Sequence, residues 1–304
     1  MNKKLTENLS PGHTTCAGCP IPIIIRTVLG AIDYPTAVTN ATGCMEVTTT
    51  IYPNTSWKVP YIHSVFGNTG ATVSGMETAY RALKKKGKVK TKKPVKFVAF
   101  GGDGGTYDIG LQALSGALER GHDFLYVCYD NGAYMNTGNQ RSGATPFGAD
   151  TETTPYGKES FGKNNWKKDI MSIVAAHKIP YTATANVGYL QDLKNKVKKA
   201  MKHDGPKFLL VFSPCPSLWK FKTSQTIKIA KLATETGFWP LYEIENGQYQ
   251  INHVSKKKLG IEEFYKTQGR FKHLFKRKDS DDIMHAIQRD IDARQERLEK
   301  LSSL

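Results

Sequence analysis

Five cysteines are the residues of this sequence with the clearest capacity for chemistry. Cys16 and Cys19 form a CxxC pair, Cys44 follows after 24 intervening residues, and Cys215 lies far downstream between two prolines. Four thiolates can hold a cuboidal iron-sulfur cluster or a structural zinc ion. A zinc ribbon usually has two CxxC pairs, so the spacing favours the cluster, with zinc and unrelated buried thiols as alternatives. Cys128 lies in an apolar stretch and is predicted to be a small core residue.

A glycine-rich turn around Asp103 is the second feature that points to chemistry. Residues 101–105 read GGDGG, directly after an apolar stretch and before an amphipathic one. In open α/β sheets this position binds phosphates through the amide groups that begin a helix. A bare carboxylate would repel a diphosphate, but a bridging Mg²⁺ removes the conflict. The turn therefore predicts a metal-diphosphate site, and a tight turn with an incidental aspartate is the alternative.

A further polar pair, Asp130 and Asn131, ends the next apolar stretch. If the two stretches are neighbouring parallel strands, Asn131 emerges at the same sheet edge as Asp103. A carboxylate and an amide oxygen can then share one octahedral ion. Tyr107 stands where the strict dinucleotide fingerprint needs its third glycine, and no Walker A sequence is present.

The elements that must position these residues form an alternating pattern of apolar strands and amphipathic helices. Strands that are nearly continuous in apolar residues are typical of parallel strands covered on both faces. The pattern predicts an α/β fold with a doubly wound, mainly parallel sheet. The predicted strands are residues 95–100, 124–129, 181–185 and 208–212, and the predicted helices are 109–120, 169–176 and 189–201.

We expect one large domain over residues 1–240 and a C-terminal extension over residues 241–304. The extension is polar and basic, and it ends in a predicted helix over residues 281–301 with sparse apolar positions. It is expected to pack on a partner or on the surface of the domain rather than to form a second core.

The formal net charge of +16 is concentrated partly in the lysine-rich segment Lys84–Lys93. Such a segment suits phosphates or an acidic protein partner, or it only keeps the chain in solution. No nucleic-acid-binding motif is present, so we expect no nucleic-acid partner. The sequence shows no signal peptide and no apolar stretch long enough to span a bilayer, which predicts a cytoplasmic protein without membrane contact.

Residues 10–225 resemble the beta subunit of pyruvate:ferredoxin oxidoreductase and its 2-oxoacid:ferredoxin oxidoreductase relatives. The spacing from Gly-Asp-Gly to Asn131 also resembles the signature of thiamine-diphosphate enzymes. Local departures from the family are Gly132 in place of a common acidic residue, and Pro20 and Leu218 in place of glycines; none removes a proposed ligand. The stretches that carry the resemblance are, in order, PGHTTCAGC, ATGC, GGDGG, YDNGAYMNTGNQRSGATPFG and SPCPS.

The resemblance implies three cofactors: thiamine diphosphate, Mg²⁺ and a four-iron four-sulfur cluster. Mg²⁺ would be held by Asp103, the Asn131 side chain and the Ala133 carbonyl. Asn136 would act as the catalytic residue, near the diphosphate and the reacting region. The cluster would be held by Cys16, Cys19, Cys44 and Cys215. The cofactor-binding residues would be Gly43, Cys44, Gly102, Asp103, Gly104, Gly105, Asn131, Asn136 and Thr137.

The implied activity is oxidative decarboxylation of pyruvate to acetyl-CoA and CO2, with electrons passed through the cluster to ferredoxin. The alternatives are the same chemistry on 2-oxoisovalerate or oxalate, a non-oxidative thiamine-diphosphate decarboxylase or synthase, and a zinc or nucleic-acid-binding module.

The implied partners are coenzyme A, the 2-oxoacid, ferredoxin, an alpha subunit, and gamma and delta subunits, of ferredoxin-like type. The alpha subunit would supply the glutamate that activates the cofactor. Glu46 and Glu77 of this chain are candidates by residue type only, and nothing else in the sequence points to them. His13 and His63 lie near the motifs and are expected to have structural roles.

Overall fold

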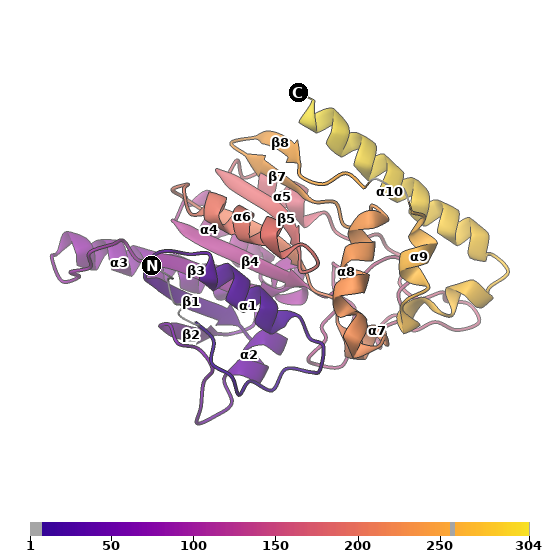
Figure 1. Cartoon of the computed structure of the whole chain (residues 1–304), viewed down its shortest axis with the longest axis horizontal. Coiled ribbons are helices and arrows are strands. Elements are labelled where there is room, and N and C mark those ends of the chain that lie inside the picture. Colours follow the sequence, from indigo (N-terminus) through magenta and orange to yellow (C-terminus); the bar gives the residue numbers. More distant parts are fainter. Residues whose placement is uncertain (1–7, 256–258, 304) are drawn as a thin grey trace.

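An eight-stranded sheet runs through the computed structural model, which describes residues 8–255 and 259–303 (Figure 1). The strand order is β2-β1-β3-β4-β6-β5-β7-β8, in which the first six strands are parallel, β7 pairs antiparallel with β5, and β8 pairs antiparallel with β7. The strands are β1 Thr36–Ala41, β2 Tyr61–Ser64, β3 Lys96–Gly102, β4 Phe124–Asp130, β5 Tyr181–Asn186, β6 Lys207–Phe212, β7 Tyr242–Glu245 and β8 Gln248–Ile251.

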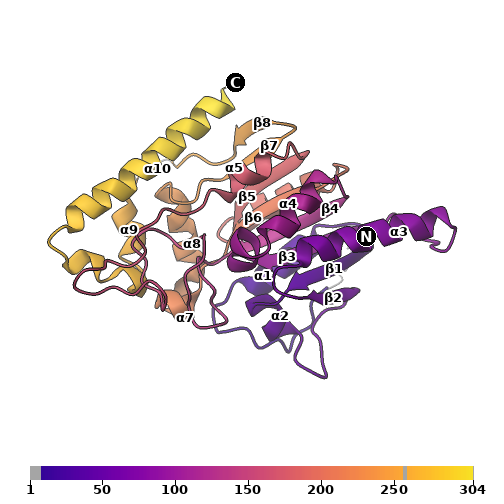
Figure 2. The ribbon, with the colours of Figure 1, turned by 180° about the vertical axis from the view of Figure 1, so that it is seen from behind.

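Helices cover both faces of this sheet. On one face α3 and α4 pack against each other, and on the other face α1 packs beside α6, as the two opposite views show (Figures 1 and 2). The helices are α1 Ile21–Gly30, α2 Cys44–Thr49, α3 Thr69–Lys85, α4 Leu111–Glu119, α5 Ile170–Ala175, α6 Leu190–Ala200, α7 Pro216–Trp219, α8 Thr226–Glu235, α9 Ile261–Tyr265 and α10 Ser280–Ser302. Four short turns are η1 Gly104–Asp108, η2 Thr223–Gln225, η3 Gly269–Phe271 and η4 Leu274–Lys276.

The central strands are buried along their whole length. Every residue of β4 (FLYVCYD) and β6 (KFLLVF) is buried, because helices cover both of their faces and no polar alternation is needed. The prediction of a doubly wound, mainly parallel sheet is confirmed. The predicted strand and helix bounds differ from the observed ones by no more than two residues.

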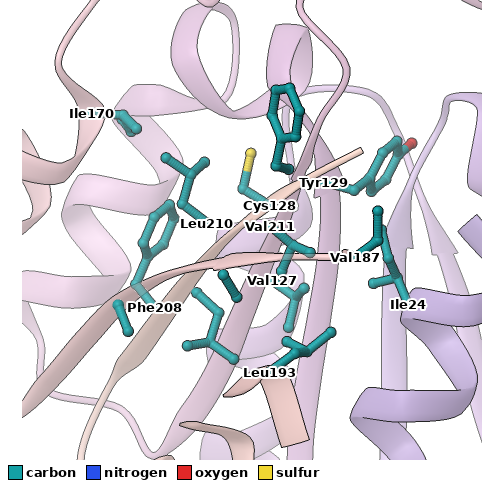
Figure 3. Close-up of a cluster of buried hydrophobic side chains, with 14 of the residues drawn as sticks. Ile24, Val127, Cys128, Tyr129, Ile170, Val187, Leu193, Phe208, Leu210 and Val211 are labelled. Atoms are coloured by element: carbon teal, nitrogen blue, oxygen red, sulfur yellow. The ribbon is translucent and has the colours of Figure 1, made fainter. Parts of the chain in front are cut away.

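The core between the sheet and its helices contains Cys128 (Figure 3). Its thiol lies among apolar side chains, with Leu210 from the neighbouring strand and Ile170 from α5 close by. The Cys128 side chain is fully buried, and burial raises the pKa of its thiol well above the ordinary value. Cys128 is therefore a core residue, as the sequence predicted.

The chain beyond residue 240 continues the same sheet. β7 pairs with β5 and β8 pairs with β7, and α10 packs on β8 and α9. α10 buries Ile283, Ile287 and Ile291 against the chain's own surface. The division into two domains at residue 240 stays a prediction. Within residues 8–255 and 259–303, no helix has the length and apolar character needed to cross a membrane.

The lysine-rich segment Lys84–Lys93 projects from the body at the far end of α3 (Figures 1 and 2). It leads into the first residue of β3, so it lies at the edge where the parallel strands begin. α3 has 17 residues, which corresponds to a length of about 25 Å. The segment is therefore about one helix length from the edge where the strands end.

Candidate active site

Asp103 and Asn131 emerge side by side at the carboxyl edge of the sheet. β3 and β4 are parallel neighbours, with Gly102 opposite Tyr129, so the residues that follow each strand meet at one edge. The expected neighbouring arrangement is thus present. The turn after β3 begins as one π-helical turn, Gly104–Asp108, before α4 starts. Such turns occur frequently at functional sites.

Three oxygen-bearing groups face one another at this edge. The end of the Asn131 side-chain amide lies 2.8 Å from Asp103 Oδ1 and 2.9 Å from the Ala133 carbonyl oxygen. With its nitrogen in that place the amide donates to both oxygens, and with its oxygen there the three groups form a ligand set. Adjacent ligand oxygens of an octahedral Mg²⁺ are about 3.0 Å apart, so the two distances from the amide in this oxygen triangle match the spacing of neighbouring ligands around this ion.

Asp103 is almost completely buried, with 1% of its surface exposed. The Ser142 hydroxyl donates to its Oδ2 at 2.5 Å, and the Asn131 backbone N–H donates to its Oδ1 at 3.3 Å. Burial, and next the negative charge of Asp130, raise the pKa of the Asp103 carboxyl well above its ordinary value. A bound cation would reverse this preference for the neutral form. Sequence reasoning missed Ser142, although it lies within the QRSGATPFG stretch.

Asp130 braces the loop that carries Asn131. It accepts hydrogen bonds from the Tyr107 hydroxyl at 2.7 Å, the Lys167 ammonium at 2.6 Å and the Gly132 N–H at 3.0 Å. The carboxylate is therefore saturated and 2% exposed, so it fixes the loop rather than facing a ligand.

A cavity of about 150 Å³ opens beside the oxygen triangle. Among its lining residues, the structure describes no glutamate. Its lining includes all the residues that the resemblance assigned to the cofactor and to Mg²⁺, which are Gly43, Cys44, Gly102, Asp103, Gly104, Gly105, Asn131, Ala133, Asn136 and Thr137. The lining residues that sequence reasoning missed are Thr42, Phe66, Tyr129, Tyr134 and Met135.

Gly104 is required by a close approach of Tyr134. A Cβ atom at Gly104 would lie 2.3 Å from the Tyr134 ring. That ring is held in place by its hydroxyl, which donates to Asp108 Oδ2 at 3.0 Å. The glycine at this position therefore shapes the wall of the cavity.

The four candidate cluster cysteines come from three separate parts of the chain. Cys16 and Cys19 lie in the loop before α1, Cys44 begins α2, and Cys215 precedes α7. Two hydrogen bonds join these parts. The Thr14 N–H donates to the Thr48 carbonyl of α2 at 2.9 Å, and the Thr226 hydroxyl, shortly after α7, donates to the Gly18 carbonyl at 2.7 Å.

The four thiols also act on one another electrostatically. Burial, and next the neighbouring thiols, raise the pKa of Cys44 to about 12. The pKa of Cys19 is also raised to about 12, mainly by burial and to a smaller extent by the thiols of Cys215 and Cys16. Across the described part of the chain, no three His, Cys, Asp or Glu residues are arranged to hold a single metal ion. A zinc ion would bring its four sulfurs to about 4 Å from each other. The four described thiols therefore lie in one region, but no three of them are arranged around a single ion.

The glutamates and histidines singled out in the sequence lie outside the cavity lining. Glu46 Oε1 accepts from the Thr50 hydroxyl at 2.7 Å and lies 3.6 Å from His63 Nδ1. His63 Nε2 contacts the hydroxyl of Thr42, a lining residue, at 2.7 Å. Glu77 pairs with Arg81 at 2.9 Å on α3. His13 Nδ1 lies 2.9 Å from the Thr15 hydroxyl oxygen.

A second cavity, of about 160 Å³, lies beneath α10. It is lined mainly by aromatic and aliphatic side chains, and it shares Tyr107 and Lys167 with the Asp130 network. None of the residues predicted for cofactor or metal binding lines it. We therefore place the candidate site at the smaller cavity, where the chemistry-bearing residues converge.

A parallel sheet with an aspartate turn and an asparagine at neighbouring strand ends is the arrangement expected of a thiamine-diphosphate enzyme. The family described as "Thiamine pyrophosphate enzyme, C-terminal TPP binding domain" matches residues 41–211, more than half of the chain. The matched region begins at the last residue of β1, ends within β6 and includes the whole oxygen triangle.

Relatives of the whole chain narrow the class to one family. Pyruvate synthase subunit PorB of Thermotoga maritima is 53% identical over 95% of this chain and 90% of its own length. PorB of Methanocaldococcus jannaschii is 52% identical over 94% of each chain. Ketoisovalerate oxidoreductase subunit VorB of Pyrococcus abyssi is 47% identical over 98% of this chain and 94% of its own. The chain belongs to this family of thiamine-diphosphate-binding 2-oxoacid oxidoreductase subunits.

A solved structure agrees with this fold. The 2-oxoglutarate:ferredoxin oxidoreductase from Magnetococcus marinus, with 2-oxoglutarate, coenzyme A and succinyl-CoA bound, matches with a TM-score of 0.60. It is 24% identical in sequence, and the match covers 71% of this chain and 69% of that one. At this identity the likeness bears on the fold alone.

Proposed function

We propose that this chain is the thiamine-diphosphate-binding subunit of a pyruvate:ferredoxin oxidoreductase. The reaction would oxidatively decarboxylate pyruvate, transfer the acetyl group to coenzyme A and pass electrons to ferredoxin. The observation that carries the proposal is the position of Cys44. It lines the cavity beside Asp103 and also belongs to the group of four mutually interacting thiols. Cofactor site and electron acceptor would thus share a residue.

The proposed Mg²⁺ ligands are Asp103, the Asn131 amide oxygen and the Ala133 carbonyl. The two distances from the Asn131 amide fit neighbouring Mg²⁺ ligands, and a cation would offset the cost of burying an ionised Asp103, whose carboxyl pKa is raised; both observations support this assignment. Thiamine diphosphate would supply the carbanion chemistry when bound. The chain's own contribution would be to hold the diphosphate through the ion and to exclude water with the Tyr129 and Tyr134 walls. Asn136 stays the predicted catalytic residue.

The proposed ligands of a four-iron four-sulfur cluster are Cys16, Cys19, Cys44 and Cys215. The electrostatic interaction of thiols from three separate parts of the chain supports one shared metal centre. The spacing of these cysteines in the sequence favours a cluster over zinc at that centre. The described cysteines are all free thiols, which suits the reducing cytoplasm that we propose for this protein.

We further propose that an alpha subunit supplies the glutamate that activates the cofactor. The cavity lining contains no glutamate among the described residues, and Glu46 is engaged by Thr50 and lies near His63. Gamma and delta subunits and ferredoxin would complete the electron path. The chain by itself is therefore expected to be inactive.

The second candidate substrate is 2-oxoisovalerate, favoured by the 47% identity to VorB over 98% of the chain. The two substrates differ by an isopropyl group in place of a methyl group. Comparing kcat/KM for pyruvate and 2-oxoisovalerate in the assembled complex decides between them. A higher value for 2-oxoisovalerate would overturn the pyruvate assignment while leaving the family reaction intact.

The deciding experiment is anaerobic purification of the chain with its co-purifying subunits, followed by iron and sulfide analysis. Cys215→Ser should remove about four irons and four sulfides per copy of this chain, together with their electron paramagnetic resonance signal. Cys128→Ala is the matched control, since it removes a core thiol and should retain the iron. Zinc, or no metal, in the oxygen-free wild-type complex at these cysteines would contradict the redox mechanism.

A further inference from the structure

Arg270 is a buried cation without a counter-ion in the described part of the chain. It lies in η3 and is 3% exposed. Its Nε donates to Gln268 Oε1 at 2.9 Å, but Nη2 has no hydrogen-bond partner, and no described carboxylate forms an ion pair with it. Burying an uncompensated charge costs several kcal/mol, and buried charges are normally paired. Some other negative group must therefore offset this charge.

The guanidinium stacks on the element that follows Cys215. Its Cζ lies 3.7 Å from the centre of the Trp219 ring and 4.8 Å from that of Phe271. Trp219 ends α7, and Cys215 is the residue that caps the start of the same short helix. The Trp219 indole N–H donates to the Asn131 carbonyl at 2.8 Å. Arg270 thus lies against the turn that joins the thiol region to the candidate metal loop.

The negative groups that act on Arg270 are few. Burial lowers the pKa of Arg270 to about 9, whereas Tyr265, Asp130, Cys215 and Asp103 act in the opposite direction. Asp130 is already saturated by Tyr107, Lys167 and the Gly132 N–H. Burial raises the pKa of the Tyr265 hydroxyl, which therefore stays neutral, and the proposed Mg²⁺ would offset the charge of Asp103. Cys215 is the remaining candidate, because its thiol becomes negative when it binds a metal.

Gly132 leaves the cation without a facing carboxylate. A Cβ at this position would lie 3.0 Å from Arg270 Nη1, and the backbone has a φ of +76° that favours glycine. The chain therefore leaves the positive charge of Arg270 unneutralised on this side as well.

We propose that Arg270 is a positioning residue, the buried counter-charge of the centre held by Cys215, and that it raises the reduction potential of that centre. The inference rests on the proposed cluster. A cluster held by four thiolates is an anion, and one-electron reduction makes it more negative by one charge. A fixed cation in a low-dielectric interior stabilises the reduced form more than the oxidised form.

The first test replaces Arg270 in the anaerobic complex and follows the cluster signal that Cys215→Ser abolishes. In Arg270→Gln the ratio of reduced to oxidised cluster at a fixed potential should fall about tenfold, which is about 59 mV for a one-electron couple. Arg270→Lys keeps the charge and should restore the ratio to within about threefold of wild type. A retained cluster with an unchanged ratio in Arg270→Gln would overturn the proposal.

A second pair of variants leaves Arg270 in place. Gly132→Asp introduces a carboxylate against Nη1, and Gly132→Asn introduces an uncharged side chain of the same shape. Aspartate and asparagine both tolerate positive φ, so the backbone strain cancels between the two. The ratio of reduced to oxidised cluster at a fixed potential should be lower in the aspartate variant than in the asparagine variant. Equal ratios would contradict the proposal even if Arg270→Gln failed to assemble.

Iron and sulfide analysis separates failure of this inference from failure of the proposed function. A wild-type complex without iron at these cysteines defeats the proposed cluster and the role of Arg270 together. If the wild-type complex contains the cluster but its reduction potential is the same in all four variants, only the role proposed for Arg270 is wrong. Arg270 would then be a packing residue.

Discussion

At the scale of single residues, both candidate metal sites hold their ligands in the neutral form. Burial raises the pKa of the Asp103 carboxyl and brings the thiols of Cys19 and Cys44 to a pKa of about 12. Metals bind the deprotonated forms of these groups, so binding would release protons and the affinity would fall at lower pH. Without a metal, the burial of these ionisable groups lowers the stability of the chain.

Asp103→Asn should therefore stabilise the apo chain while removing its response to the cofactor. Because the folded-state pKa of Asp103 is raised, the fold is destabilised at neutral pH, either by a buried carboxylate or by the cost of protonating it. That penalty shrinks as the pH falls below the folded-state pKa and is gone below the unfolded-state pKa. We expect a gain of about 1–2 kcal/mol in the unfolding free energy at pH 7. Thermal unfolding with and without Mg²⁺ and thiamine diphosphate measures both effects.

Wild type should unfold at a higher temperature when Mg²⁺ and thiamine diphosphate are added together, and Asp103→Asn should not. The destabilisation of wild type by Asp103 should vanish as the pH falls to the ordinary pKa of aspartate, about 4. An apo variant that is less stable than wild type at pH 7 would show that the hydrogen bonds from Ser142 and Asn131 outweigh the buried charge.

At the scale of elements, the turn between β3 and α4 is shaped by what packs against it. The π-helical turn Gly104–Asp108 holds Tyr134 through Asp108, and Tyr107 reaches back to Asp130. One short turn thus fixes both the wall of the cavity and the loop that carries Asn131. Small changes in this turn are expected to disturb the cavity before they unfold the sheet.

Gly104→Ala should weaken cofactor binding and destabilise the chain by about 1–3 kcal/mol, because the added Cβ would lie 2.3 Å from the Tyr134 ring. Gly75→Ala is the matched control in α3, where a Cβ meets nothing within 4 Å. The control should be neutral or stabilise by about 0.5–1 kcal/mol, since alanine favours a helix. Denaturant unfolding and calorimetric titration with thiamine diphosphate and Mg²⁺ measure the two effects. Equal stability and equal cofactor affinity in the two variants would show that the contact with Tyr134 does not require glycine at position 104.

At the scale of the whole molecule, the C-terminal region completes the structure around the site. β7 and β8 extend the sheet, α10 packs on β8, and η3 carries Arg270 to the turn after Cys215. The lysine-rich segment Lys84–Lys93 projects from the opposite edge, about one helix length away (Figure 1). A protein that takes electrons directly from the proposed cluster would have to approach the edge where the strands end.

Ile291→Ala tests whether α10 is part of the cooperative fold. Ile291 is 2% exposed, and the truncation should cost about 2–4 kcal/mol in the free energy of unfolding. Glu296→Ala, at an exposed position of the same helix, should cost less than about 0.5 kcal/mol. Chemical denaturation should give one transition for both variants. A separate early transition in Ile291→Ala would show that α10 unfolds independently of the sheet.

The sequence alone determined the features that depend on local pattern. Continuous apolar stretches require strands covered on both faces, and the polar residues that end two successive strands must emerge at one edge if the strands are parallel neighbours. Asp103 and Asn131, the parallel sheet and the core role of Cys128 follow from this reasoning. The spacing of the four cysteines already favoured a cluster, and the family resemblance added Ala133 and Asn136.

Only the tertiary structure decided which distant segments meet. The bond from Thr226 to Gly18 spans 208 residues, and Ser142 reaches Asp103 across 39 residues. Arg270 reads in the sequence as one more basic residue of a polar tail, yet it is buried against Trp219. Hydrophobic periodicity reports only which face of an element is buried. The partner of that face depends on the strand order and on the path of the C-terminal region, which are set by packing of the whole chain.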